Sequence, residues 1–280
     1  MGVQARLVLW TPDEATAQRA ARAAFARLAR VDRALSDWLV DGELARLEER
    51  AGGPAVAVSE DLYRCLERSL EIARATDGAF DPTLGALTRL WREARRTGVA
   101  PTEAELDAAR ARVGWRHVAL DPRGRTVRLA VEGMRLDFGG IGKGWGADRA
   151  LEVLAAHGVE RALVGLSGDH VLGAPPPGAA GWKLLAGTRP DNQRELVLAS
   201  CAVATSGDTE QFFELDGVRT SHILDPRTGL GVVARPLVTV VAPDGATADA
   251  LASAISVVGP EAADDLLARF DGARVLFERP

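Results

Sequence analysis

Residues 137–148 read DFGGIGKGWGAD, a run of closely spaced glycines around a single lysine. We expect a strand over 134–138 to lead into this run and a helix over 145–157 to follow it. Glycines leave consecutive backbone N–H groups unshielded by a Cβ, so these groups can point into one concavity. The helix N-terminus adds partial positive charge, and Lys143 adds a full one. The segment therefore predicts a strand, a turn and a helix that together bind a phosphorylated ligand.

This segment matches neither standard nucleotide-binding signature. It shows no Gly-x-Gly-x-x-Gly pattern with a ribose-binding acid downstream, and Lys143 is not followed by Ser or Thr. Taken alone, a tight turn with a solvent-directed lysine explains it equally well. However, Lys143 and Lys183 are the only lysines in a chain otherwise supplied with arginine. This usage favours a selected point charge at Lys143.

The composition bounds the class of protein. With 280 residues, 47% of them hydrophobic and 26% charged, the chain can build one large core or two modest domains. A formal charge of -5 argues against a nucleic-acid partner, as does the lack of a basic cluster beside aromatic residues. No run reaches transmembrane length, and residues 1–10 do not resemble a signal peptide. As written, the chain is expected to be cytoplasmic, although an exported protein with its leader removed would look the same.

The period of the apolar residues changes along the chain. The first third is mostly helical, with expected helices over 13–35, 41–50, 59–76 and 102–114 after an initial strand over 6–10. Later segments alternate as strands do, with one more helix near the C-terminus. Strands are expected over 117–120, 126–129, 162–165, 195–198, 202–205, 211–215, 218–224 and 236–241, and the helix over 248–257. Because helices and strands neither alternate strictly nor separate cleanly, the pattern predicts an α+β or mixed-sheet fold.

Asp249 and Ser253 are four residues apart in the C-terminal helix. A helix that begins at Thr247 places both side-chain oxygens on one face, where they could share a hard cation such as Mg²⁺. The competing explanation is structural, because an acid near a helix start complements the dipole and a small serine eases packing. The segment alone leaves both explanations open.

Other candidates lie beside turns. His222 directly precedes a turn-forming segment, 225–229, and could act as a general base, although a strand histidine is more often a hydrogen-bonded surface residue. Trp38 and Phe80 lie on constrained loops and could stack on a planar ring. Core packing explains either aromatic residue equally well.

Taken together, these segments resemble the ApbE family of FAD:protein FMN transferases over nearly the whole chain. Six separated blocks occur in the family's order, which is far more specific than any one of them. The blocks are 35–38 with 41–44, 78–83 with 90–91, 137–144 with 148–150, 168–169, 204–208 with 222–229, and 247–251.

The resemblance implies one catalytic domain over 1–280, with mixed sheets flanked by helices and a helical subregion at about 12–114. It implies that FAD is a substrate and that Mg²⁺ assists transfer of FMN to a Thr or Ser hydroxyl of an acceptor flavoprotein, with release of AMP. His222 resembles the family's base. The implied metal ligands are Asp249, Ser253 and the Gly140 carbonyl, and the implied FAD contacts are Met1, Trp38, Ala79, Phe80, Asp81, Asp137, Lys143 and Ile223.

Two departures from the family pattern affect the metal. Ser253 replaces a frequent threonine and keeps its oxygen, whereas Ala252 replaces an acid found in some members, so one or two metal ions are possible. Two alternative functions stay open. An FAD pyrophosphatase would give free FMN and AMP, and a non-catalytic flavin-binding module would need neither a metal nor a base.

Overall fold

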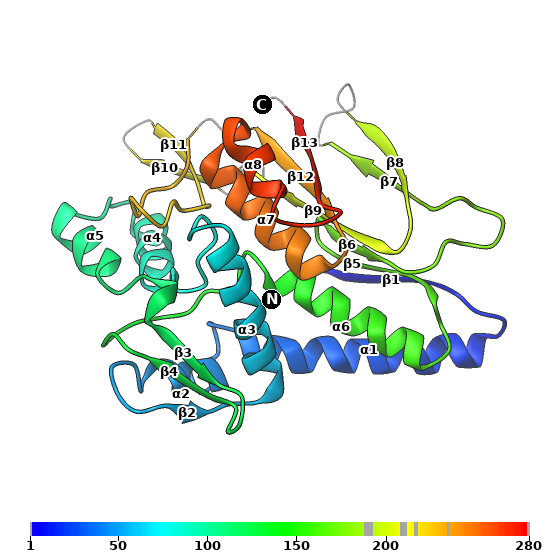
Figure 1. The fold of residues 1–280 in the computed structure, drawn as a ribbon, viewed down its shortest axis with the longest axis horizontal. Helices are drawn as coiled ribbons and strands as arrows, with labels where there is room; N and C mark the ends of the chain where they lie inside the picture. The colour runs from blue at the N-terminus through cyan, green and yellow to red at the C-terminus, as the bar shows by residue number, and fades with distance from the viewer. Residues whose placement is uncertain (1, 188–192, 208–211, 216–217, 234–235, 279–280) are drawn as a thin grey trace.

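The computed structural model of the protein describes residues 2–187, 193–207, 212–215, 218–233 and 236–278, with the backbone alone for 212–215 and 218–220. Its centre is a six-stranded sheet with the order β1-β5-β6-β9-β12-β13, in which all neighbours are antiparallel. The strands are β1 (Ala5–Trp10), β5 (Arg161–Leu166), β6 (Asp169–Leu172), β9 (Cys201–Ser206), β12 (Leu237–Ala242) and β13 (Arg274–Glu278). Helices cover one face of this sheet (Figure 1). The α+β class predicted from the sequence is confirmed.

Three helices of the first half of the chain begin at residues whose side chains cap them. Helix α1 (Glu14–Leu35) is capped by Asp13, and α3 (Glu60–Ala75) by Ser59. Helix α5 (Glu103–Arg110) begins with a full capping box formed by Thr102 and Glu105. In each case the side chain accepts a hydrogen bond from a first-turn N–H group that has no partner within its helix.

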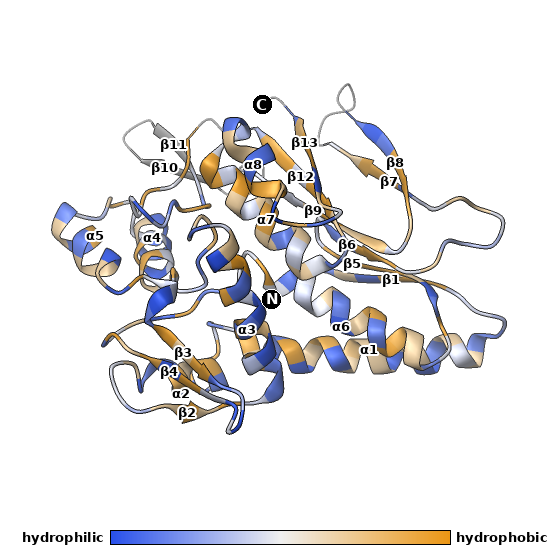
Figure 2. Ribbon diagram, viewed as in Figure 1, coloured by the Kyte–Doolittle hydropathy of each residue, from blue (hydrophilic) through white to orange (hydrophobic). Residues whose placement is uncertain are grey.

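Helices α6 (Gly142–Ala156) and α7 (Gly245–Val258) pack against the sheet and against each other, and α1 lies along α6 (Figure 1). Hydrophobic colour runs along β12 and α7, whereas α1 alternates between polar and apolar turns (Figure 2). This difference follows burial, because every residue of β12 is buried and α7 is buried along most of its length.

The remaining elements surround this layer. They are α2 (Glu43–Glu48), α4 (Gly85–Thr97), α8 (Ala263–Leu267), the sheet of β2 (Val56–Ala57), β4 (Thr126–Leu129) and β3 (Val118–Asp121), the hairpin of β7 (Trp182–Ala186) and β8 (Arg194–Leu198), the hairpin of β10 (Phe212–Leu215) and β11 (Val218–Ser221), and 3₁₀ turns at Trp115–His117 and Pro260–Ala262. The expected strand over 218–224 thus ends at Ser221, and residues 211, 216 and 217, at the ends of the strand expected over 211–215 and in the connection after it, lie outside the described residues.

Three expectations near the glycine-rich run are wrong. Residues 134–138 form no strand, and their sheet pairing is one isolated bridge between Leu84 and Arg135. Helix α6 begins at Gly142, inside the run, rather than at 145. Helix α7 begins at Gly245 with Asp244 as its cap, so Thr247 is already in its first turn. Glycine is tolerated in these first turns because a tertiary contact requires it.

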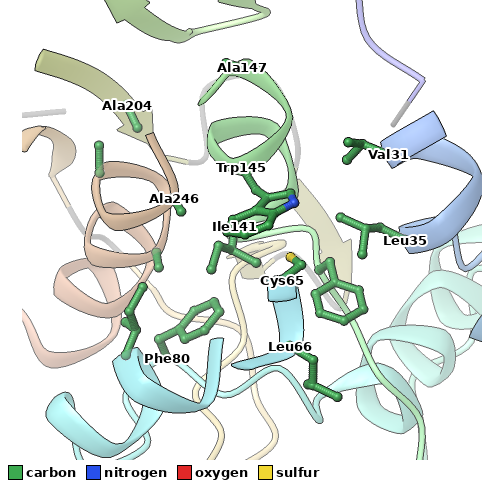
Figure 3. Packing of buried hydrophobic residues seen from close by; sticks show 14 of the residues in the cluster. Val31, Leu35, Cys65, Leu66, Phe80, Ile141, Trp145, Ala147, Ala204 and Ala246 are labelled. Atoms are coloured by element: carbon green, nitrogen blue, oxygen red, sulfur yellow. The ribbon is translucent and has the colours of Figure 1, made fainter. Parts of the chain in front are cut away.

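The main core lies beneath the two helix starts. Ile141 and Trp145 at the start of α6 are surrounded by Leu35 of α1, Cys65 of α3 and Phe80 (Figure 3). All five side chains are buried. The glycine-rich run therefore lies on a packed apolar base.

Candidate functional site

The N-termini of α6 and α7 are in backbone contact. A Cβ placed on Gly144 would lie 1.9 Å from the Gly245 carbonyl oxygen, and one placed on Gly245 would lie 2.5 Å from the Gly144 carbonyl oxygen. No other residue type fits such a contact without moving the backbone. The two helix starts can therefore approach this closely only because both positions are glycine.

Each of these helices also carries an aspartate that binds the start of the other. Asp148 of α6 accepts from the Gly245 and Ala246 N–H groups at 2.7 and 3.0 Å. Asp249 of α7 accepts from the Gly144 N–H group at 3.1 Å. In both helices the aspartate follows the contact glycine by four residues. We call this arrangement the α6–α7 junction, defined by Gly144, Asp148, Gly245 and Asp249.

Asp148 is the structural member of the junction. Both of its oxygens bind backbone N–H groups, and its residue is buried. Burial raises the pKa of the Asp148 carboxyl to about 7. The hydrogen bonds from the two N–H groups lower this pKa, but their effect is smaller than that of burial.

Asp249 faces a lysine. The Lys143 ammonium lies 3.0 Å from Asp249 Oδ1, 3.2 Å from Asp169 Oδ2 and 3.3 Å from the Gly139 carbonyl oxygen. Burial alone would lower the pKa of Lys143, but the two carboxylates outweigh burial and raise it above its ordinary value. Lys143 is therefore a positively charged bridge between two buried acids.

Asp169 was not among the predicted site residues. It begins β6 after the tight turn at Ser167 and Gly168, where Ser167 adopts a left-handed φ of 54°. Burial and the Asp249 charge raise its pKa to about 7, while Lys143 lowers it. An acid directly after a strand and a two-residue turn was the available sequence signal, but its partner 26 residues earlier could not be read from it.

Gly140, Phe80 and Ser253 meet beside this charged cluster. A Cβ placed on Gly140 would lie 2.9 Å from Ser253 Oγ and 3.4 Å from Phe80 Cε2, so a side chain there would fill the space next to the hydroxyl. The Asp249 carboxylate lies one helical turn from Ser253 on α7. A carboxylate, a hydroxyl and a nearby main-chain carbonyl are hard oxygen donors, and this set fits Mg²⁺.

The described residues contain no group of three or more His, Cys, Asp or Glu side chains suited to a metal. A site built on Asp249, Ser253 and the Gly140 carbonyl differs from such a group, because two of its three donors are a hydroxyl and a main-chain oxygen.

Hydrogen bonds to the Asp81 carboxylate fix the loop of Ala79, Phe80 and Asp81. Asp81 Oδ1 accepts from the Thr83 N–H and hydroxyl groups at 2.8 and 2.6 Å, and Asp81 Oδ2 accepts from the Trp115 N–H group at 3.0 Å. Burial raises the pKa of Asp81 despite these hydrogen bonds. In this structure the Asp81 carboxylate shapes the loop, and Ala79 and Phe80 are buried beside it.

Asp137 lies next to that loop. Its N–H group donates to the Pro82 carbonyl at 2.8 Å, and its Oδ1 accepts from the Gly139 N–H group at 2.7 Å. Asp137 therefore connects the 79–82 loop to the start of the glycine-rich run. Together with Gly140, Lys143, Asp249 and Ser253, these residues form one neighbourhood.

The other predicted residues belong to different elements. Trp38 is 70% exposed, and the Arg92 guanidinium lies 4.5 Å from the centre of its ring. His222 follows β11 and is exposed, and Ile223 is half-buried against the main core. Met1 lies outside the described residues. The roles assigned to all these side chains stay predictions.

Over the described residues, no helix combines the length and the apolar character needed to cross a membrane.

The chain resembles known proteins along most of its length. A protein-family model described as the ApbE family matches residues 1–277. The FAD:protein FMN transferase of Treponema pallidum is 38% identical over 258 residues, which cover 86% of this chain and 71% of that protein. The protein of the same name from Vibrio cholerae is 33% identical and covers 84% of this chain and 72% of that protein.

Solved structures agree in fold. Flavin transferase ApbE from Vibrio cholerae, in a histidine-to-glycine mutant, superposes with a TM-score of 0.87 at 29% identity and covers 99% of this chain and 94% of that one. The ApbE protein from Thermotoga maritima gives a TM-score of 0.87 at 31% identity, with 99% and 91% covered.

Proposed function

The chain belongs to the ApbE family and is an enzyme, and we propose that it transfers FMN from FAD to a protein. In the full proposal the reaction requires Mg²⁺, the acceptor is a Thr or Ser hydroxyl of a flavoprotein, and AMP is released. The relatives' name supports FAD as the flavin donor and a protein as the acceptor.

The observation that carries the proposal is the charged cluster at the α6–α7 junction. Two buried acids, Asp169 and Asp249, share the single Lys143 ammonium. With both carboxylates ionised, one negative charge is left over, and it would repel a diphosphate. A divalent cation reverses the sign of the cluster and lets the diphosphate of FAD approach.

Asp249, Ser253 and the Gly140 carbonyl would hold this cation. When bound, Mg²⁺ supplies charge neutralisation to the phosphate oxygens. Lys143 orients the Asp249 carboxylate, and it contributes positive charge beside the glycine-rich run.

His222 would take the proton of the acceptor hydroxyl. The freed oxygen then forms a bond to the FMN phosphorus of FAD, and the bond between that phosphorus and the bridging oxygen breaks. AMP leaves with the bridging oxygen, and His222 holds the proton until solvent removes it. An exposed position after β11 suits a base that must reach a second protein.

The test is intact-mass analysis of an acceptor flavoprotein domain incubated with this protein, FAD and Mg²⁺, with chromatography of the released nucleotides. A covalent FMN adduct together with AMP supports the proposal. AMP and free FMN without an adduct would assign hydrolysis instead, and unchanged FAD would contradict both reactions.

A pair of serine variants tests the metal assignment. Ser253→Ala removes a proposed ligand. With Mn²⁺ as the probe of the proposed Mg²⁺ site, we expect the affinity measured by calorimetry to fall by about tenfold, and the yield of FMN adduct to fall as well. Ser256→Ala is the matched control, because that hydroxyl already donates to the Ala252 carbonyl at 2.8 Å. Equal Mn²⁺ affinity in both variants would remove Ser253 from the metal site.

A further inference from the structure

Helix α4 lies against several segments of the proposed site. It begins just after the 79–82 loop, and the Gly85 N–H group at its start donates to the Arg135 carbonyl at 3.2 Å. A Cβ placed on Gly85 would lie 2.7 Å from the Leu136 carbonyl oxygen. The first turn of α4 is therefore packed against the segment that leads into the glycine-rich run.

Trp91 of α4 holds residues 221–232, which follow β11, fold back through a bridge between Leu224 and Gly231, and are called the His222 hairpin below. Its indole Nε1 donates to the Gly229 carbonyl at 2.7 Å, at the tip of that hairpin. Arg110 of α5 donates to the neighbouring Thr228 carbonyl at 3.1 Å. Leu224, which pairs with Gly231 in this hairpin, is buried in a small separate core with Trp91.

Backbone hydrogen bonds join the two arms of the His222 hairpin between this tip and the histidine. The Asp225 N–H group donates to the Leu230 carbonyl at 2.8 Å, and the Val232 N–H group donates to the Ile223 carbonyl at 2.9 Å. The Ser221 N–H group then donates to the Val232 carbonyl at 3.0 Å. Because this ladder brackets His222, a displacement of the tip moves the histidine with it.

Arg92, the next residue of α4, holds a different segment. Its guanidinium stacks 4.5 Å from the centre of the Trp38 ring and forms an ion pair with Asp37. Trp38 is 70% exposed, so Arg92 supplies an ordered contact for a ring that is otherwise largely in solvent.

We infer that α4 positions two halves of the site: Trp91 sets the place of His222, and Arg92 sets the place of Trp38. Trp91 and Arg92 are positioning residues rather than catalytic ones. The inference rests on the proposed function, in which His222 acts on the acceptor hydroxyl and Trp38 contacts the flavin.

The Arg92 half predicts an effect on flavin binding. Arg92→Gln removes both the stack on Trp38 and the ion pair with Asp37, and we expect the FAD dissociation constant, measured by flavin fluorescence, to rise by about fivefold or more. Arg95→Gln is the matched control on the same helix, because Arg95 is exposed. Unchanged FAD affinity in Arg92→Gln would overturn this half.

The Trp91 half predicts an effect on His222 with little effect on FAD binding. Trp91→Phe keeps an aromatic ring but removes the indole donor, and we expect the transfer rate at saturating FAD to fall by between about tenfold and a hundredfold. Arg110→Gln loosens the same tip from a half-buried side chain of α5, so it gives a smaller fall even where Trp91→Phe folds poorly.

Histidine ring NMR separates positioning from general damage. The chain has four histidines, so single variants can assign every ring signal. In Trp91→Phe and Arg110→Gln we expect the His222 signal to move while those of His117, His157 and His170 stay in place. A stationary His222 signal, or movement of all four, would overturn this half.

These readouts fail separately from the proposed function. If the wild-type protein forms no FMN adduct, the proposed reaction is wrong. The FAD affinity and NMR results would still support or overturn the two contacts of α4.

Discussion

The α6–α7 junction and the His222 hairpin are held in opposite ways. At the junction, two helices meet backbone to backbone, and each supplies an aspartate to the other's first turn. The His222 hairpin is held at its tip by one indole and one guanidinium from α4 and α5, and Ile223 packs against the main core from its side. The proposed metal half of the site is thus built from two helix starts, whereas the proposed base half lies on a hairpin whose tip is held by side chains of two other helices.

This difference separates two kinds of mutational effect. Damage at the junction should reduce folding stability and metal affinity together, because the same contacts serve both. Damage at the hairpin should reduce the rate with smaller effects on either quantity. The following predictions test that separation, beginning with the largest expected effect.

Gly144→Ala should have the largest effect. Its Cβ would lie 1.9 Å from the Gly245 carbonyl, so the two helix starts must separate, and we expect a loss of about 3 kcal/mol or more of unfolding free energy. Thermal unfolding measures the loss. Gly168→Ala is the control, since no atom lies within 4 Å of its added Cβ. Equal melting temperatures in the two variants would show that the junction is not tightly packed.

Asp148→Asn should have an intermediate effect. The amide keeps one acceptor oxygen but points an NH₂ group at a backbone N–H, which costs about 1–3 kcal/mol. Urea unfolding measures this cost, and we expect Mn²⁺ affinity to fall as well because α7 shifts. The control is Asp265→Asn, at an exposed acid of α8. A stability loss without any change in Mn²⁺ affinity would break the proposed link between folding and the metal site.

Substitution of His170 should have the smallest effect on folding stability, and only at acidic pH. Burial lowers the pKa of this imidazole, on β6, below its ordinary value. The neutral ring therefore favours the folded state above about pH 6.5, and that contribution is lost as pH falls through the lower folded pKa.

His170→Gln removes this titration with a side chain of similar size. Between pH 7 and 5 we expect the wild type to lose more melting temperature than the variant, by an amount worth under about 1 kcal/mol. The pH profile of FMN transfer should be the same in both, because His222 lies on the hairpin. A changed pH profile of FMN transfer in His170→Gln would show that His170 affects the reaction as well as the stability of the fold.

Much of the fold follows from local signals. The caps at Asp13, Ser59 and Thr102 were readable because each is a short-range hydrogen bond encoded within four residues. Helix α4 was missed for the same reason. It starts at a glycine after Leu84, with no side-chain cap, so its N-terminus carries no local signal.

The arrangement of the candidate site residues was predictable only where these residues share an element. The spacing of Asp249 and Ser253 correctly places them on one helix, and the glycine-rich run correctly marks a helix start. The ion pair of Asp169 with Lys143 and the hydrogen bonds of Asp148 to the start of α7 depend on long-range packing. The repeated Gly-x-x-x-Asp pattern at 144–148 and 245–249 was the sequence signal for these Asp148 hydrogen bonds.

The junction also sets when the site can form during synthesis. The hydrogen bonds that complete the starts of α6 and α7 join residues 97 to 106 positions apart. A ribosome delivers Lys143 and Asp148 long before it delivers Gly245 and Asp249. Until α7 emerges, α6 lacks the partner that fits its glycine, and Asp249 is absent. The nascent chain therefore cannot form the proposed metal site early, and the candidate site is among the last parts of the molecule to be assembled.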